Sequence, residues 1–540
     1  MQTLTKTISG AKILLKTLEN LGVNSIFGYP GGIVLNVYDE LSKQNSIKHY
    51  LMRHEQAAVH AAEGYSRVTG KCGVALVTSG PGATNIVTGV ANAYLDNYPL
   101  VVITGQVSSE LLYKDAFQEV DIIDITKSCT KKGYQVRDVK DLEQTVKEAF
   151  RTAMSGRKGP VVIDITKNVF SEETEFVGEK IDFENEVSKT DVSEIINAIK
   201  CSKKPLLIAG GGVIQSGAMK NLFDFAKSLK IPVVASMMGL GSYPEDDENY
   251  IGMIGIFGQY AANQAVRESD LVIAIGTRFN DRITCCFKKE DLAKKLVHID
   301  IDEKEISKII LAKIGVVEDA KIVLEKLNEQ LSEFRTLDFS QWLKEAQKLE
   351  NSNKEPLKRS EKMHSFEVLE KIQECLNGKN LVITTEVGQH QVWAARYLKF
   401  NSPNKFITSG GLGTMGFGFP AAIGACVAEN KPVICIAGDG SFQMNIQELA
   451  ICVDYNLPVK IFVLNNGYLG MVRQFQEKTC EERYYGTKIS NPDFIKLAES
   501  YGAKAIRVEK TEDIEKAVNE ALSSNGTVIV DFAIEPKELL

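Results

Sequence analysis

The stretch that decides the fold is VICIAGDGS at residues 433–441, followed by the pair Asn465-Asn466. Val433 to Ala437 form an apolar run that stops at a glycine turn, which is typical of a short buried strand. Apolar residues then recur at helical spacing, and a later apolar run, Val459 to Leu464, predicts a second buried strand. The pattern therefore places an aspartate and a carboxamide at the ends of two adjacent strands, with a helix beginning after Ser441.

These residue types suit a metal-diphosphate site. A hard cation such as Mg2+ prefers oxygen ligands in octahedral geometry, often a carboxylate together with phosphate oxygens. The start of a helix offers amide donors and partial positive charge to a phosphate. A lone Gly-Asp-Gly is usually an ordinary turn, but the paired strand ends favour Asp439 and Asn466 as candidate Mg2+ ligands.

Further words of the sequence carry a resemblance to a known family. The GDG to NN spacing resembles the thiamine-diphosphate fingerprint, and the other words resemble the large catalytic subunit of acetohydroxyacid synthase (acetolactate synthase). They run in family order along nearly the whole chain: FGYPGG (27–32), RHEQ (53–56), AEGY (62–65), TSGPGATN (78–85), DAFQE (115–119), TSGGLGTMG (408–416) and NNGYLGMV (465–472).

Composition narrows the class of protein. The chain has 540 residues, 44% of them hydrophobic and 25% charged, which is ordinary for a soluble globular protein of two to four domains. Its net charge of -7 and the lack of a long basic stretch argue against nucleic-acid binding, and no apolar run approaches the ~18 residues of a membrane span. Ten cysteines without Cys-x-x-Cys pairs suggest small buried hydrophobes in a reducing compartment. We therefore predict a cytoplasmic protein whose first helix, Ile8 to Leu21, is not a cleavable signal.

Strand-like and helical patterns alternate along the chain, which predicts α/β domains built on parallel sheets. Residues 171–190 and 335–362 interrupt the alternation and are predicted to be surface linkers, with a helix possible in the second. We therefore predict three domains, each a parallel β-sheet flanked by helices, at 1–180, 190–335 and 363–540.

The resemblance assigns a role to each predicted domain. It implies a thiamine-diphosphate-binding fold twice, for the aminopyrimidine in the first domain and for the diphosphate and Mg2+ in the third, with a central FAD-type domain. It also implies a homodimer or homotetramer with active sites at the subunit interface, and a possible small regulatory subunit.

Glu55 is the first candidate catalytic residue, since it matches the family glutamate that hydrogen-bonds the aminopyrimidine. It also begins a helical run, where a carboxylate is favoured by the dipole alone. Met415 matches the wedge that bends the cofactor, although an isolated Met is usually core filler, and His390 could equally be a surface histidine. The residues matched to thiamine diphosphate are Glu55, Gly388, Gln389, His390, Gly413, Met415, Asp439, Gly440, Ser441, Asn466 and Tyr468, with Asp439, Asn466 and the Tyr468 carbonyl as metal ligands.

Substrate and flavin residues are also implied by the resemblance. Gln118 is the second catalytic candidate, and the substrate channel is matched by Phe117, Lys167, Arg282, Met471 and Phe475. Arg282 is the favoured partner of a 2-oxo acid carboxylate, because a guanidinium can donate two parallel hydrogen bonds. The residues matched to FAD are Arg157, Gly211, Gly212, Arg278, Asp300 and Asp319. The sequence departs from the family at Phe475, usually tryptophan, and at Glu318, usually glycine.

The implied reaction decarboxylates pyruvate on thiamine diphosphate and condenses the hydroxyethyl enamine with pyruvate or 2-oxobutyrate, in the biosynthesis of valine, leucine and isoleucine. One alternative is another thiamine-diphosphate-dependent decarboxylase or carboligase. A second comes from Gly411-x-Gly413-x-x-Gly416, which satisfies the dinucleotide pattern with Asp439 following about 20 residues later, and would indicate a nucleotide-dependent dehydrogenase.

Overall fold

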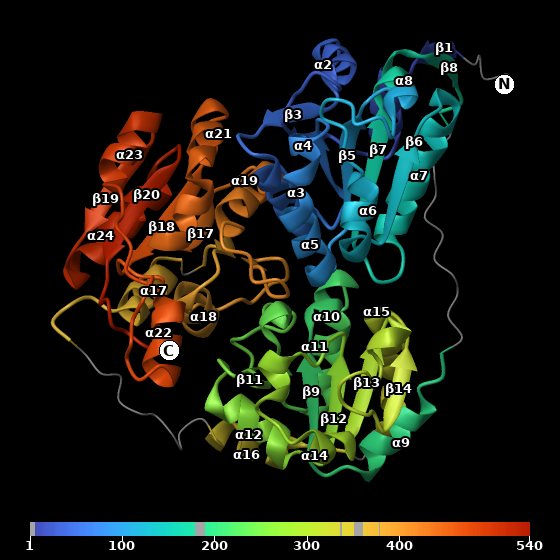
Figure 1. The fold of residues 1–540 in the computed structure, drawn as a ribbon. Helices are drawn as coiled ribbons and strands as arrows, with labels where there is room; N and C mark the ends of the chain where they lie inside the picture. The colour runs from blue at the N-terminus through green and yellow to red at the C-terminus, as the bar shows by residue number, and fades with distance from the viewer. Residues whose placement is uncertain (1–5, 179–189, 335–336, 350–359, 377) are drawn as a thin grey trace. The chain divides into compact units, whose positions relative to one another are not determined.

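The computed structural model describes residues 6–178, 190–334, 337–349, 360–376 and 378–540. The chain forms two compact units. The first comprises Met1–Asn185, Leu381–His390 and Ile407–Pro536, and the second comprises Glu186–Asn380, Gln391–Phe406 and Lys537–Leu540. Figure 1 follows the chain from the blue N-terminal sheet through the green central sheet to the orange and red C-terminal sheet.

The two sheets of the first unit share one strand order. The N-terminal sheet runs β3-β2-β4-β5-β7-β6 and the C-terminal sheet runs β16-β15-β17-β18-β20-β19, so each has its strands in the order 2-1-3-4-6-5. The N-terminal strands are β2 (Ser25–Gly28), β3 (Lys48–Leu51), β4 (Gly73–Val77), β5 (Leu100–Gln106), β6 (Lys132–Val136) and β7 (Pro160–Thr166). The C-terminal strands are β15 (Val382–Thr385), β16 (Phe406–Ile407), β17 (Val433–Gly438), β18 (Val459–Asn465), β19 (Lys504–Val508) and β20 (Val528–Ala533). Order reverses between β15 and β17, which is where open α/β sheets bind ligands.

The central sheet has a different order, β11-β10-β9-β12-β13-β14, or 3-2-1-4-5-6. Its strands pair in parallel and are β9 (Pro205–Ala209), β10 (Val233–Ala235), β11 (Tyr250–Met253), β12 (Leu271–Ile275), β13 (Leu296–Asp300) and β14 (Ile314–Val317). This order is the one found in dinucleotide-binding domains.

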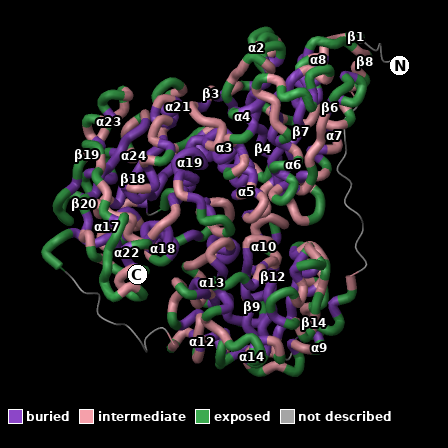
Figure 2. Tube along the Cα trace, viewed as in Figure 1, coloured by how far each residue is buried: buried purple, intermediate pink, exposed green. Residues whose placement is uncertain are grey.

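Helices cover the sheets, whose strands form the buried core shown in purple in Figure 2. Those of the first unit are α1 (Gly10–Asn20), α2 (Leu35–Ser42), α3 (Glu55–Thr69), α4 (Pro81–Thr84), α5 (Val87–Asp96), α6 (Ile122–Thr126), α7 (Val139–Met154), α8 (Lys167–Ser171), α19 (Gly418–Glu429), α20 (Asp439–Phe442), α21 (Leu449–Asp454), α22 (Gly470–Thr479), α23 (Phe494–Tyr501) and α24 (Ile514–Ser523). Those of the second unit include α9 (Ser193–Cys201), α10 (Gly211–Gln215), α11 (Met219–Leu229), α12 (Tyr260–Glu268), α13 (Asp281–Thr284), α14 (Lys289–Ala293), α15 (Ala320–Glu329), α16 (Ser340–Lys348) and α17 (Ser365–Cys375), and α18 (Gln389–Tyr397) follows.

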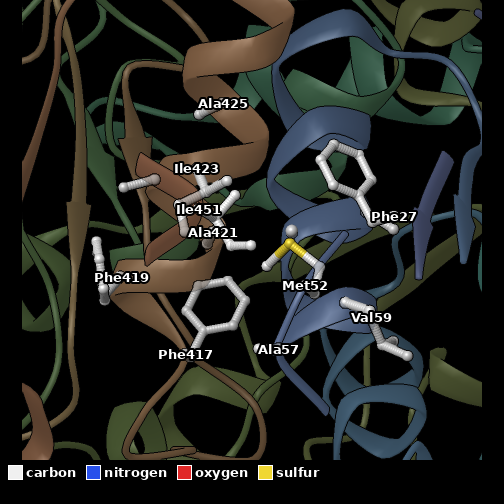
Figure 3. Close-up of a cluster of buried hydrophobic side chains, with 14 of the residues drawn as sticks. Phe27, Met52, Ala57, Val59, Phe417, Phe419, Ala421, Ile423, Ala425 and Ile451 are labelled. Carbon is white, nitrogen blue, oxygen red and sulfur yellow. The ribbon is translucent and has the colours of Figure 1, made fainter. Parts of the chain in front are cut away.

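Helices α3 and α19 join the N- and C-terminal sheets through one apolar core, shown in Figure 3. A Cβ at Gly64 would lie 2.1 Å from the Ala421 carbonyl oxygen, and one at Gly424 would lie 1.8 Å from that of Ala61. Only glycine fits at these two positions, because any side chain would push the helices apart. The close packing fixes the middle of α3 against α19, and Glu55 stands at the first turn of the same helix.

The predicted fold class is confirmed: three parallel sheets are flanked by helices. Two local predictions are wrong. Ile8 lies in strand β1 (Lys6–Ser9), and the helix begins only at Gly10. The predicted linker 171–190 contains strand β8 (Glu173–Phe176), which pairs antiparallel with β1.

Residues 179–189 of that stretch lie outside the described residues, as do 335–336 and 350–359 of the second predicted linker. The helix considered possible there is α16, whose Trp342 and Leu343 are buried.

The predicted burial of Cys426, Cys435 and Cys452 is confirmed, and all ten cysteines are free thiols. Among the described residues no helix is both long and apolar enough to cross a bilayer.

Candidate active site

Asp439 is the centre of the C-terminal cluster. The predicted helix start after Ser441 is wrong, because Asp439 is itself the first residue of α20. Helix α20 has only four residues, and the backbone is kinked shortly after it, at Asn445. The Asp439 carboxylate is 1% exposed and accepts hydrogen bonds at Oδ2 from Gly467 N (2.9 Å) and Asn491 Nδ2 (2.7 Å). Burial raises its pKa despite these donors. A cation beside Oδ1 would offset the cost of that buried charge.

The loop after β18 brings the other predicted metal ligands to Asp439. Gly467, between Asn466 and Tyr468, donates to the Asp439 carboxylate, and Asn466 Oδ1 accepts from Tyr468 N at 2.9 Å. Strands β17 and β18 are parallel neighbours, so their carboxyl ends meet at one edge of the sheet. The donor set of one carboxylate, one carboxamide and one carbonyl suits Mg2+.

Two glycines, Gly388 and Gly438, pack against His390 at the β15/β17 switch point. The His390 ring lies so close that a Cβ at Gly388 or at Gly438 would come within 2.8 or 2.7 Å of it. Burial lowers the pKa of His390 to about 3, so the ring is neutral, and its buried Nε2 has no hydrogen-bond partner among the described residues. A buried polar atom without a partner is costly, so a phosphate oxygen or its bound proton would suit this position. The residues therefore fit a metal-bound diphosphate.

Gln389 and the remaining predicted residues lie close by. Gln389 Nε2 donates to Gln474 Oε1 at 2.8 Å, and its Oε1 lies 2.0 Å from where a Cβ at Gly470 would stand. Gly440 follows Asp439, and Ser441 Oγ donates to Gly438 O. Met415 is half-buried, and Gly413 is exposed with a φ of +74° that favours glycine.

Glu386 is a functional candidate that sequence reasoning missed. Its carboxylate is fully buried and accepts from Gly416 N (2.6 Å) and Phe419 N (2.9 Å), which fixes the backbone just after Met415. Asn445 Nδ2 donates to Gly416 O from the other side at 2.6 Å. The sequence did contain a signal: like Asp439, Glu386 directly follows a buried strand, and a glycine, Gly388, stands two residues later.

Glu386 is expected to make the protein less stable as the pH rises. Burial raises its pKa from 4.5 to about 7, so the folded chain holds a proton that the unfolded chain has released. The free energy of unfolding therefore falls across this window, by at most about 3 kcal/mol. Urea unfolding at both ends of the window should show a smaller loss for Glu386→Gln than for the wild type. Equal losses would contradict the assignment, since the other buried acids with raised pKa values, Glu448 and Glu63 among them, are the same in both proteins.

Glu55 is half-buried at the first turn of α3 in the N-terminal domain. His54 caps the helix, since its side chain accepts from Gln56 N. Asn85 Nδ2 donates to Glu55 Oε2 at 2.9 Å, and Glu55 Oε1 lies 3.4 Å from where a Cβ at Gly82 would stand. Two residues of the TSGPGATN word, Gly82 and Asn85, thus lie against the Glu55 carboxylate, and the Asn85 hydrogen bond orients it.

Gln118 lies on a strained loop beside the same word. The φ of Gln118 is +62°, and a Cβ added to Gly80 would come within 2.8 Å of the Gln118 Cβ. The Glu119 carboxylate holds this loop by accepting from Ala116 N (2.9 Å) and Tyr113 N. Phe117 projects with 89% of its surface exposed.

The other predicted substrate residues are dispersed. Lys167 is exposed at the start of α8, and Met471 and Phe475 lie on α22, with Phe475 43% exposed. Arg282 is on α13 in the second unit, where its side chain is exposed. The structure therefore brings Asp439 together with the loop bearing Asn466 and Tyr468, whereas the predicted substrate residues lie on separate elements.

The predicted flavin residues are also divided. Arg157 belongs to the first unit and donates to Asn97 Oδ1 at 2.6 Å. In the second unit Arg278 follows β12, Asp300 ends β13, and Asp319 caps α15 by accepting from Lys321 N. The Glu318 carboxylate accepts from Thr190 Oγ1 and Asp319 N.

The glycines after β9 have a structural explanation of their own. A Cβ at Gly212 would lie 2.6 Å from Gly276 Cα, and one at Gly211 would lie 3.2 Å from Met238 O. The Gly276 contact requires glycine whether or not a nucleotide binds, so these residues alone do not indicate a flavin.

The dinucleotide pattern at Gly411-x-Gly413-x-x-Gly416 is in the wrong setting. The strand before it, β16, has two residues and lies at the edge of its sheet, away from the switch point. Asp439 is engaged by Gly467 and Asn491. The geometry disfavours a dehydrogenase site here.

Comparison with known proteins gives the family. Three family models match: the thiamine pyrophosphate enzyme N-terminal TPP binding domain at residues 8–125, the central domain at 192–327, and the C-terminal TPP binding domain at 386–532. The chain is 42% identical to the acetolactate synthase large subunit of Haemophilus influenzae, covering 99% of this chain and 96% of that protein. It is 43% identical to a probable acetolactate synthase large subunit of Methanocaldococcus jannaschii (99% and 93% covered) and 40% identical to the acetolactate synthase isozyme 3 large subunit of Escherichia coli (98% and 96% covered). Because the three domain models match in order along the chain, and because these relatives are at least 40% identical over nearly its whole length, the chain belongs to the thiamine pyrophosphate enzymes, among the acetolactate synthase large subunits.

Proposed function

We propose that this chain is the catalytic subunit of an acetolactate synthase, which decarboxylates pyruvate and joins the remaining two-carbon unit to a second 2-oxo acid in branched-chain amino acid biosynthesis. The observation that carries the proposal is the buried Asp439 carboxylate, held by the Gly467 amide in a chain similar to acetolactate synthases from end to end. Thiamine diphosphate supplies, when bound, the carbon nucleophile that attacks the 2-oxo acid carbonyl.

The C-terminal residues hold the diphosphate in this proposal. Asp439, Asn466 and the Tyr468 carbonyl would bind Mg2+, while the His390 ring and the glycines at Gly388, Gly440 and Gly413 would line the diphosphate. Gln389 and Ser441 complete the polar lining. Met415 packs against the cofactor from the loop that Glu386 and Asn445 fix.

The N-terminal residues handle the proton and the substrate. Glu55, oriented by Asn85, would hydrogen-bond the aminopyrimidine of the bound cofactor and would hold a proton at that contact. Gln118 orients the reacting group, and Phe117, Lys167, Arg282, Met471 and Phe475 line the approach of the 2-oxo acid. The Arg282 guanidinium binds its carboxylate.

A homo-oligomer would cover side chains that one copy leaves exposed. Phe117 and Tyr485 are about nine-tenths exposed, and burying such rings against a second copy is favourable. We therefore propose a homodimer or homotetramer in which two copies complete each active site. The curated relatives are named large subunits, and we extend a small regulatory partner to this chain as well. Ten free thiols suit a cytoplasmic location.

FAD is proposed for the central domain on the strength of its 3-2-1-4-5-6 strand order, whose switch point lies between β9 and β12. Gly211, Gly212, Arg278, Asp300, Asp319 and Arg157 would contact it. The absorption spectrum of the purified chain tests this directly, because bound flavin is yellow.

The test of function is pyruvate turnover by the purified chain with thiamine diphosphate and Mg2+, with and without added FAD. Acetolactate as product supports the proposal. Acetaldehyde would favour the alternative of a thiamine-dependent decarboxylase, and NAD(P)H turnover without either product would favour a dehydrogenase.

A further inference from the structure

The Met415 loop, residues 408–416, is held by side chains that no role above uses. Glu63 and Arg67 lie on α3, and Asn92 and Asp96 lie on α5. Each is at most 3% exposed. We call these four residues the Arg67 network. They belong to the N-terminal domain and the loop belongs to the C-terminal domain, so the network forms polar contacts between two domains of the first unit.

Within the network one cation faces two carboxylates. Arg67 Nε donates to Glu63 Oε1 at 3.0 Å, and its Nη2 lies 2.5 Å from Asp96 Oδ2. Asn92 Nδ2 donates to Glu63 Oε2 at 2.9 Å, and the guanidinium lies over the Tyr98 ring at 4.1 Å. The Arg67 side chain is therefore held in one geometry.

The backbone of the loop is bound by the two charged ends of this network. Asp96 accepts from Gly411 N at 2.7 Å and from Gly410 N at 3.2 Å, and Arg67 Nη1 donates to Thr408 O at 2.9 Å. In the first half of the loop, the N–H groups of Gly410 and Gly411 and the C=O group of Thr408 are thus bound by the N-terminal domain.

The side chains of the loop are bound by Asn92. Its Oδ1 accepts from Ser409 Oγ at 2.5 Å and from Thr414 Oγ1 at 2.9 Å. Ser409 Oγ in turn accepts from Thr414 N at 2.9 Å. These bonds reach the residue directly before Met415.

The chemistry of the network argues for a purpose beyond packing. Burying ions is costly, and well-packed apolar residues often serve stability as well. Apolar residues cannot, however, bind the backbone of a loop with four glycines, which would otherwise sample many conformations.

We infer that Arg67, Asp96 and Asn92 are positioning residues that hold Met415 in one place against the cofactor, an inference that rests on the proposed function. None of the three is among the residues assigned above to substrate or cofactor. Their effect passes through the loop, so loosening them should alter how the cofactor is held and activated while leaving substrate binding unchanged.

The first test uses the cofactor-free protein. Thr414→Val removes one hydroxyl bond to Asn92, and Asp96→Asn removes the charge that binds Gly410 and Gly411. Backbone hydrogen–deuterium exchange of residues 408–416 should become about fivefold faster in Thr414→Val and faster still in Asp96→Asn. Thr527→Val is the matched control, since it removes a buried hydroxyl bond to Leu457 O in the same unit, and it should leave exchange in the loop unchanged.

The second test loads thiamine diphosphate and Mg2+ and follows exchange of the acidic cofactor C–H proton with deuterium by NMR. We expect slower proton exchange and lower kcat in both test variants, with KM for pyruvate unchanged. Loop exchange equal to wild type, or a faster loop with unaltered cofactor exchange, would overturn the inference. A wild type that binds no thiamine diphosphate would instead overturn the proposed function, and the two failures are thereby distinguished. If Asp96→Asn does not fold, Thr414→Val still decides.

Discussion

Glu55→Gln should retain its fold and bind thiamine diphosphate, yet lose between about 100-fold and 10,000-fold in kcat. The carboxamide has nearly the same shape as the carboxylate and can still bond Asn85, so the first turn of α3 is preserved. It cannot supply the charge that favours the required tautomer of the aminopyrimidine. Steady-state acetolactate formation, together with the thermal midpoint, measures both expectations.

Glu148→Gln is the matched control for this variant, because it makes the same chemical change at a partly exposed position on α7, where Glu148 pairs with Arg151. It should keep wild-type kcat. A Glu55→Gln variant with a near-wild-type rate would rule out the catalytic role of Glu55. A variant that is inactive because it has unfolded would be recognised by its lowered thermal midpoint.

Asp439→Ala should weaken the binding of thiamine diphosphate with Mg2+ at least about 100-fold, since even groups that only support a metal ligand matter by 10- to 100-fold. It removes the carboxylate on which Gly467 and Asn491 converge, so the loop bearing Asn466 and Tyr468 also loses its anchor. Titration calorimetry with the cofactor in excess Mg2+ should then give no measurable heat.

Asp247→Ala provides the comparison for Asp439→Ala. Asp247 likewise accepts several hydrogen bonds, from Lys227, Tyr243 and Asn249, but it lies in the central domain. Its loss should affect stability and leave cofactor affinity unchanged. Wild-type affinity in Asp439→Ala would exclude Asp439 as a metal ligand.

The features that could be predicted from the sequence are those whose residues all lie in one continuous segment of the chain. Apolar runs identified β17 and β18, and the residues that directly follow them, Asp439 and Asn466, must then lie at one sheet edge. Strand β1 was missed because a four-residue strand has little pattern of its own and exists through pairing with β8, more than 150 residues away.

The Arg67 network could not be found in this way. Glu63 belongs to the AEGY motif at 62–65, but this motif does not predict that Arg67 contacts Asp96. Nor does it predict that these two residues bind Thr408 and Gly411. Such contacts depend on how α3 and α5 pack against a loop from the other end of the chain. Asn491, which holds Asp439, is likewise placed by tertiary structure and carries no local signal.

The order in which the chain is synthesised gives the shared core of α3 and α19 a further consequence. The first unit is discontinuous, with Met1–Asn185 separated from Ile407–Pro536. At ribosomal rates of about 5–20 residues per second, the nascent N-terminal domain waits roughly 10–45 s for its covering helix. During that time the face of α3 carrying Ala57, Ala61 and Gly64 is open to water. Newly made chains are thus most prone to aggregation, and most in need of chaperones, before α19 leaves the ribosome.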